Sequence, residues 1–221
     1  MDMHRIPEPE VMDNPEQVVS YVQADFRESN QFFVNWFRSQ FPDFETGHIV
    51  DLGCGSADIA IRFCRALPGI KITAVDASAP MLDSARLGIL RAGLSSRVRL
   101  IHGYLPNISL PEENYDAVIC NDMLHHLPDP IALWQKIAVL GRPGVPIMLR
   151  DLSRPDSPQE AQAIVNALAG TESPIVQKDF YYSLLASYVP AEIEEQLVLA
   201  GLTNMQIQIV SRSHLVVWGK V

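Results

Sequence analysis

Long apolar runs, basic clusters and cysteine pairs are all missing from this sequence, and each absence narrows what the chain can be. No apolar run approaches the roughly 20 residues needed to cross a bilayer, so we expect no membrane partner. The first ten residues contain neither the basic nor the apolar segment of a secretory signal peptide. The cysteines, Cys54, Cys64 and Cys120, form no Cys-x-x-Cys pattern and lie beside no histidine at metal-ligand spacing. We therefore expect a cytoplasmic protein with reduced thiols and no bound metal.

Basic side chains are outnumbered, which argues against a nucleic-acid partner. The chain has 26 Asp and Glu against 17 Lys and Arg, a formal net charge of −9, and no run of Lys or Arg. Such a surface repels phosphate backbones, so we expect no nucleic-acid partner. With 221 residues, 48% of them hydrophobic, the chain has enough material for the core of one α/β domain.

From residue 47 onward, short β-rich runs alternate with helical stretches. This alternation is typical of a parallel sheet covered by helices. The expected strands cover residues 48–52, 70–75, 98–101, 115–120 and 145–149, and the helices between them cover 57–67, 79–92 and 130–140. Further helices are expected at 158–169 and 190–200, whereas the aromatic stretch around 180–182 is assigned no element. Two β-rich runs, 205–210 and 214–218, are joined by a short polar turn and predict an antiparallel C-terminal hairpin.

The first 46 residues differ from this pattern. Residues 1–14 are rich in Pro, Asp and Glu and predict an extended arm, followed by two aromatic-rich helices beginning near Pro15. The aromatic stripe fits core packing as well as a lid over a ligand pocket. We expect residues 1–46 to form an arm and helical cap, and 47–221 a ligand-binding domain with a lid-like insertion at about 155–190.

A glycine-containing turn, Asp51-Leu52-Gly53-Cys54-Gly55, lies where the first expected strand leads into a helix. Glycine permits a positive φ and lets the backbone approach a ligand closely, although a purely structural turn uses glycine in the same way. Asp76 ends the second expected strand, where a carboxylate can accept hydrogen bonds from ribose hydroxyls. An Asp there can also cap the next helix, but Ser78 is available for that role. In open α/β sheets, ligands bind beyond the carboxyl ends of the strands.

Three segments together resemble the class I S-adenosylmethionine-dependent methyltransferases of the small-molecule type. They are Ile49-Val50-Asp51-Leu52-Gly53-Cys54-Gly55, Ala74-Val75-Asp76-Ala77-Ser78 with Met81, and Tyr115-Asp116-Ala117-Val118 through His125-His126-Leu127-Pro128-Asp129-Pro130. The resemblance covers roughly residues 47–151. It implies a Rossmann-like α/β fold with a seven-stranded sheet, parallel except for an antiparallel strand in the C-terminal hairpin. It also implies S-adenosyl-L-methionine as the cofactor.

By position, the resemblance implies a set of cofactor-binding residues. Asp51 would hold the ammonium group of the cofactor, the glycines would flank its methionine part, and Asp76 would bind the ribose. The complete set is Asp51, Gly53, Gly55, Asp76, Ala77, Met81, Gly103, Tyr104 and Asn121. Two positions depart from the family pattern: Tyr104 stands where relatives usually carry an Asp that contacts adenine, and Ala57 replaces a third glycine.

Methyl transfer requires an acceptor atom in line with the activated methyl, so positioning supplies much of the acceleration. A base is needed only if the acceptor carries a proton. Asp122 and His125 are the candidates, with His126 less favoured because adjacent side chains diverge. The alternative roles are helix capping for Asp122 and a helix start for the histidines.

Acceptor-binding candidates surround the same edge of the expected sheet. They are Tyr21, Arg150, Arg154 and Tyr181, each of which packing or a structural ion pair explains as well. Two other functions stay open at this point: a nicotinamide-dependent oxidoreductase, and a non-catalytic scaffold or sensor that keeps the pocket. We expect a small-molecule acceptor and a monomer or homodimer.

Overall fold

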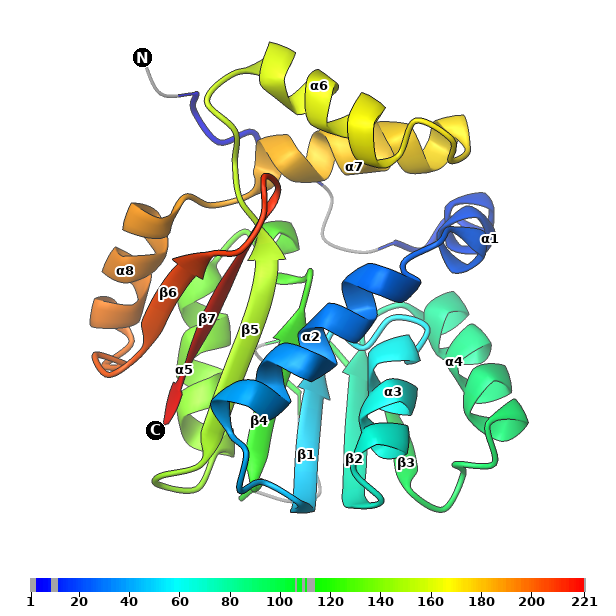
Figure 1. Cartoon of the computed structure of the whole chain (residues 1–221), viewed down its shortest axis with the longest axis vertical. Coiled ribbons are helices and arrows are strands. Elements are labelled where there is room, and N and C mark those ends of the chain that lie inside the picture. Colours follow the sequence, from blue (N-terminus) through cyan, green and yellow to red (C-terminus); the bar gives the residue numbers. More distant parts are fainter. Residues whose placement is uncertain (1–2, 9–11, 106, 109, 111–113, 221) are drawn as a thin grey trace.

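The computed structural model describes residues 3–8, 12–105, 107–108, 110 and 114–220. Its centre is a seven-stranded sheet with the order β3-β2-β1-β4-β5-β7-β6 (Figure 1). The strands are β1 (Thr46–Leu52), β2 (Gly69–Asp76), β3 (Val98–His102), β4 (Ala117–Asn121), β5 (Pro146–Leu152), β6 (Gln206–Ile209) and β7 (His214–Lys220). Strands β1 to β5 pair in parallel, and β7 runs antiparallel to both β5 and β6.

Helices cover both faces of the sheet and the end where the parallel strands finish. They are α1 (Pro15–Gln23), α2 (Arg27–Gln40), α3 (Asp58–Ala66), α4 (Ala79–Arg91), α5 (Pro130–Leu140), α6 (Pro158–Leu168), α7 (Pro174–Ala186) and α8 (Pro190–Leu199), with a 3₁₀ turn, η1 (Leu124–His126). Figure 1 shows α2, α3 and α4 on one face, α5 and α8 on the other, and α6 and α7 lying across the carboxyl ends of the strands. The parallel sheet is therefore buried on both faces, as its connections require.

Proline and a capping side chain mark most helix starts. Ser78, Ser157 and Ser173 each accept a hydrogen bond from a backbone N–H in the first turn of the helix that follows, and proline occupies the first or second position of those helices. The missing N–H of proline leaves no hydrogen bond unmade there, and its fixed φ suits the helix.

Successive side chains of a strand point to opposite faces of the sheet, so the core forms two layers. In β1, Ile49 packs into the layer shared with α2 and α3, whereas Val50 and Leu52 pack into the layer shared with α5 and α8. A smaller cluster, which includes Ile164 and Leu184, holds α6 and α7 together. The site at the carboxyl ends of the strands thus rests on a packed frame.

The predicted fold is confirmed, including the antiparallel ending. One element was missed: α7 occupies the stretch that had been assigned no structure. Tyr115 lies just before β4 and forms an isolated bridge with Gly141. Among the described residues, no helix is long and apolar enough to cross a membrane.

Candidate functional site

A cavity of about 1190 Å³ lies beyond the carboxyl ends of the parallel strands. Its floor is formed by the ends of β1, β2, β4 and β5 and the loops that follow them, and residues of α1 and α7 contribute to its walls. This is the edge where open α/β sheets bind ligands, because the loops there diverge around the point at which strand order reverses.

The loop after β1 is held in a shape that presents its backbone to the cavity. The N–H groups of Gly53 and Cys54 both donate to the Val75 carbonyl at 2.9 Å. Gly55 has a φ of +51°, and a Cβ placed on it would meet no atom within 4 Å, so its exposed side is open space. Ala57, at the position of the family's third glycine, has a φ of +62°. A left-handed conformation at alanine is strained, and strained backbone of this kind gathers at functional sites.

Asp76 joins this loop to the end of β2. Its carboxylate accepts hydrogen bonds from the Gly55 N–H at 2.7 Å and from the Ser78 N–H at 2.8 Å. Burial raises the pKa of Asp76, and these two hydrogen bonds oppose that rise. Ser78 caps α4 by accepting from the Met81 N–H, as predicted.

Asp51 is a buried carboxylate, and one of its oxygen atoms has no hydrogen-bond partner. Its side chain is 1% exposed, and its Oδ2 atom has no hydrogen-bond partner. Burial, with a smaller contribution from the charge of Asp76, raises the pKa of Asp51 to about 7. An unpartnered buried polar group destabilises a fold, so its presence at a cavity wall indicates a ligand-binding role. It fits the ammonium group that the resemblance places here.

The end of β4 carries a charged cluster. Asp122, with a φ of +52°, accepts hydrogen bonds from Arg150 Nη2 and from Asn121 Nδ2, both at 2.9 Å. Burial favours the neutral acid, but the Arg150 guanidinium and, secondarily, His214 outweigh it and lower the pKa of Asp122. Arg150 also donates to the Ser29 carbonyl at the start of α2. This pairing ties the cap helix to the sheet.

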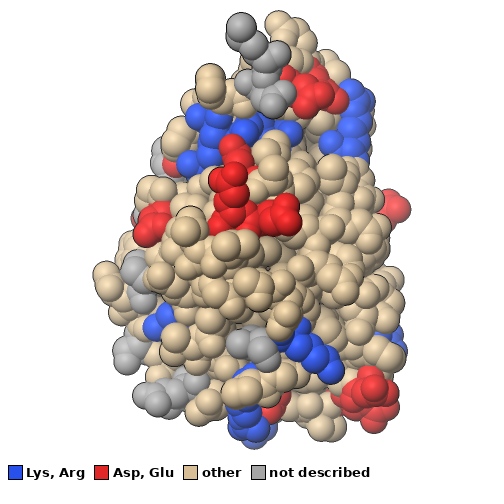
Figure 2. All heavy atoms as spheres, turned by 90° about the vertical axis from the view of Figure 1, so that its left-hand side faces the viewer, with Lys and Arg blue, Asp and Glu red and all other residues tan. Residues whose placement is uncertain are grey.

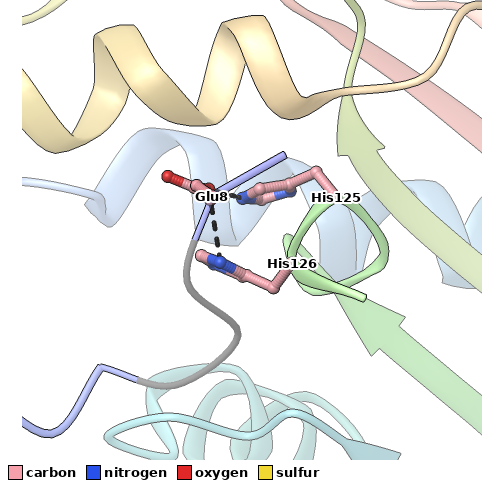
Figure 3. A group of neighbouring side chains, drawn as sticks. All are labelled: Glu8, His125 and His126. Carbon is pink, nitrogen blue, oxygen red and sulfur yellow. Dashed lines mark ion pairs between the residues drawn. The ribbon is translucent and has the colours of Figure 1, made fainter. Parts of the chain in front are cut away.

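His125 forms a second polar centre three residues after Asp122, in the 3₁₀ turn η1. Its Nδ1 lies 2.5 Å from Asp151 Oδ1, and the other carboxylate oxygen of Asp151 accepts from the Leu124 N–H. Burial lowers the pKa of His125, but the charge and hydrogen bond of Asp151 outweigh it and raise the pKa above the ordinary value. The Nε2 atom points to Glu8 Oε1 at 3.5 Å (Figure 3).

Most of the residues singled out from the sequence come together here. Those that line the cavity are Tyr21, Asp51, Gly53, Gly55, Asp76, Ala77, Met81, Gly103, Asn121, Asp122, His125 and Arg150. Three others lie elsewhere. Tyr104 is 48% exposed and contacts the His102 ring, Arg154 pairs with Glu192 at 2.7 Å, and Tyr181 packs between α6 and α7.

Sequence reasoning missed three residues of this site. Ser183 lines the cavity and donates to Glu8, which lies 3.5 Å from His125 Nε2, and His214 lies 3.6 Å from Asp122 Oδ1. Each comes from a segment far along the chain from the motifs, and no spacing signal connects them. Asp151 was not predicted either, although an acidic residue at the end of a buried parallel strand is a usable signal.

Comparisons with known proteins agree with this geometry. A family model described as a methyltransferase domain matches residues 49–144. The ubiquinone biosynthesis O-methyltransferase of Stutzerimonas stutzeri is 29% identical over 127 residues, which is 58% of this chain and 53% of that protein. The chain thus spans about half the length of the curated relatives it matches.

Solved structures show the same fold at low identity. A SAM-dependent methyltransferase from Aquifex aeolicus superposes with a TM-score of 0.67 and 16% identity, covering 94% of this chain and 98% of that one. The plantazolicin methyltransferase, solved with a triazolic desmethylPZN analog and SAH, gives a TM-score of 0.67 and 16% identity, with coverage of 92% and 89%.

Proposed function

Because the chain belongs to the class I S-adenosylmethionine-dependent methyltransferases, we propose that it transfers a methyl group to a small-molecule acceptor held above the carboxyl ends of the strands. The single observation that carries the proposal is the cavity, which joins the cofactor loop to a further polar wall. Its volume exceeds what a single ligand pocket usually needs, so it has room for two molecules.

The cofactor end of the cavity is formed by β1, β2 and the loops after them. When bound, S-adenosylmethionine supplies an activated sulfonium methyl group. Asp51 would accept the ammonium of the methionine part, because its Oδ2 is buried and unpaired. Gly55 leaves open space beside the loop, and Asp76 stands where ribose hydroxyls can replace its present backbone donors. Gly53, Ala77, Met81, Gly103 and Asn121 line the same end, whereas the outward position of Tyr104 argues against a contact with adenine.

The acceptor would lie between the cap and the loops after β4 and β5. We assign residues 1–46 and about 155–190 to the cover of this space, since α1 packs on α7 and Tyr21 lines the cavity. Arg150 lines the cavity, but its guanidinium already donates to Asp122 and to the Ser29 carbonyl. We therefore assign it a structural role in the wall, and we do not expect its charge to bind the acceptor. Arg154 would have a structural role through its ion pair with Glu192, and Tyr181 would have one through packing against the cluster of α6 and α7.

The acidic composition supports a small molecule over nucleic acid as the acceptor. On the face that carries α8, basic side chains form small groups near acidic ones and make no continuous band (Figure 2). The three cysteines are free and buried, which supports a reducing compartment such as the cytoplasm.

His125 is the better candidate for the proton acceptor. Asp122 is held as an ion by Arg150, and its lowered pKa makes it a weak base at neutral pH. In contrast, Asp151 fixes the ring of His125 through Nδ1, so Nε2 is the atom that would take the proton, in exchange for its contact with Glu8. The Asp151 carboxylate then stabilises the imidazolium that forms when His125 takes a proton.

Calorimetric titration with S-adenosylmethionine tests the cofactor assignment. Asp76→Asn should weaken binding at least about tenfold, because it weakens charge-assisted hydrogen bonds worth about 1.5–3 kcal/mol. Asp83→Asn is the matched control, since Asp83 is an exposed residue of α4 paired only with Arg86. Absence of binding by the wild-type protein, or binding of NAD in its place, would overturn the proposal.

Turnover across oxygen, nitrogen, sulfur and carbon acceptors tests the transfer step. For an acceptor that must lose a proton, kcat should rise with pH as His125 becomes neutral, with a midpoint above the ordinary histidine value of about 6.5. Asp151→Asn should lower that midpoint. Cofactor binding without turnover on any acceptor class would identify a scaffold instead.

A further inference from the structure

Three side chains with metal-binding atoms converge on the cavity wall beside η1. Glu8 comes from the N-terminal arm, and His125 and His126 come from η1 itself (Figure 3). Glu8 Oε1 lies 3.5 Å from His125 Nε2 and 3.2 Å from His126 Nδ1, and the ligand atoms of all three side chains lie within 4.8 Å of one another.

These separations match the edges of a small coordination polyhedron. Zinc binds nitrogen and oxygen at about 2.0–2.1 Å, so tetrahedral geometry places neighbouring ligand atoms about 3.3 Å apart. The two edges that meet at Glu8 already have this length. The third edge, between the two histidine nitrogens, is no longer than 4.8 Å.

The surroundings hold these donors as an outer shell holds metal ligands. Asp151 accepts from Nδ1 of His125, which fixes the tautomer whose Nε2 lone pair is available to a metal. The Ser183 hydroxyl donates to Glu8 Oε1 at 2.8 Å. Arg5 donates to the His125 carbonyl at 2.8 Å and to the Ala186 carbonyl, and thereby fastens the arm beside η1.

Charge at this wall favours a bound cation. The carboxylates of Asp179 and Asp151 lie close enough to Glu8 to add negative charge beside it. The arm's own cation, Arg5, directs its hydrogen bonds to backbone carbonyls and stacks on the Tyr188 ring at 4.3 Å. The wall therefore attracts a positive charge, which either a proton or a metal ion can supply.

We propose that Glu8, His125 and His126 form a site for a divalent transition-metal ion of the Zn²⁺ class, with one coordination position open to the cavity. Two imidazoles and one carboxylate suit Zn²⁺ and neighbouring late first-row ions, whereas Mg²⁺ and Ca²⁺ prefer oxygen ligands alone. The absence of cysteine from the set argues against a thiolate-based structural site. The prediction of no bound metal rested on the spacing of cysteines and histidines. Spacing gives no signal for a ligand that comes from the distant N-terminal arm.

The site shares His125 with the proposed function, and its Nε2 can hold a proton or a metal ion but not both. Metal binding needs no cofactor and proton transfer needs no metal, so each is measured in the absence of the other. Metal titrations use cofactor-free protein, and the pH dependence of turnover is measured in the presence of a chelator. Failure of one proposal then leaves the other intact.

The test uses the full chain without an affinity tag, stripped with a chelator and titrated with Zn²⁺ by calorimetry. We expect one ion per chain, and with Co²⁺ the visible absorption bands of a four- or five-coordinate site. Glu8→Gln and His126→Ala should each weaken Zn²⁺ binding at least tenfold. These two positions are chosen because both are partly exposed, whereas replacing the 2% exposed His125 endangers the fold.

His4→Ala is the matched control, because His4 is an exposed histidine on the same arm. It should leave Zn²⁺ affinity unchanged, and Asp151→Asn should weaken binding about 10- to 100-fold through the outer shell. Circular dichroism of each variant confirms that it is folded. No binding by the wild-type chain would overturn the proposal, as would equal affinity of wild type, Glu8→Gln and His126→Ala.

Discussion

Replacement of Asp51 by asparagine should make the cofactor-free protein more stable at pH 8, and the gain should shrink as the pH falls. The pKa of Asp51 is raised to about 7 by burial, against about 3.9 for an unfolded Asp. The folded state therefore holds a proton that the unfolded state releases, and stability falls as the pH rises from about 4 to about 7. Each pH unit in that window removes about 1.4 kcal/mol.

Over the full window the loss amounts to about 4 kcal/mol, and between pH 5 and pH 8 to about 2–3 kcal/mol. The asparagine side chain would occupy the same space without a charge, so the variant lacks this loss. At pH 5 the folded wild type buries a neutral acid, but its unfolded state is already ionised, so the variant should still be more stable by about 1–2 kcal/mol. The difference between the two curves isolates Asp51 from other titrating groups such as Asp76.

Guanidinium unfolding of cofactor-free protein at pH 5, 6, 7 and 8 measures this difference. Asp83→Asn, at an exposed position, should follow the wild-type curve within about 0.5 kcal/mol. Asp51→Asn should also bind S-adenosylmethionine at least about tenfold more weakly, since it loses a charge-assisted hydrogen bond of about 1.5–3 kcal/mol. A gap between Asp51→Asn and wild type that stays constant from pH 5 to pH 8 would refute the argument.

Other substitutions separate fold from ligand binding. Asp122→Ala should destabilise the protein by about 3–5 kcal/mol in chemical denaturation, because it leaves the 2% exposed Arg150 side chain unpaired; a loss under about 1 kcal/mol would contradict this. Gly55→Ala and Gly93→Ala should each cost about 1–2 kcal/mol, since both glycines have a positive φ and open space at the Cβ position. Only Gly55→Ala should weaken S-adenosylmethionine binding in calorimetry, because only Gly55 lines the cavity. Tyr104→Ala should change that affinity less than about twofold, and a larger loss would place its ring on the cofactor.

Local patterns predicted the frame and the cofactor end of the site. The strands of the parallel sheet are buried on both faces, so they stand out as short apolar runs between turns. Asp51, Gly55 and Asp76 follow such runs directly, and strand ends in one sheet meet at one edge. Helix α7 was not predicted, although the sequence contains its start signal, Ser173-Pro174.

The other side of the site depends on contacts that no local pattern encodes. Glu8 reaches His125 only because Arg5 and the Ile6 N–H fasten the arm to the end of α7. Arg154 looks available in the sequence, but Glu192 of α8 takes it. Tertiary packing between distant segments decides which charged side chains form internal ion pairs and which can bind a ligand.

Backbone strain and unmet hydrogen bonds occur together at the ends of β1 and β4. Among the described residues, the non-glycine positions with positive φ are Ala57 and Asp122, which follow β1 and β4. Three buried oxygen atoms without a hydrogen bond, Asp51 Oδ2, Asn121 Oδ1 and Asp122 Oδ1, lie along the same two strand ends. A fold tolerates such costs where a ligand relieves them, and the ammonium group proposed to bind at Asp51 would relieve one of them. At η1, Asp151 and Glu8 already contact both ring nitrogens of His125, so a ligand there must compete with internal partners. If the proposed function holds, the cofactor therefore gains a carboxylate without a partner at Asp51, whereas the acceptor must displace Glu8 from His125.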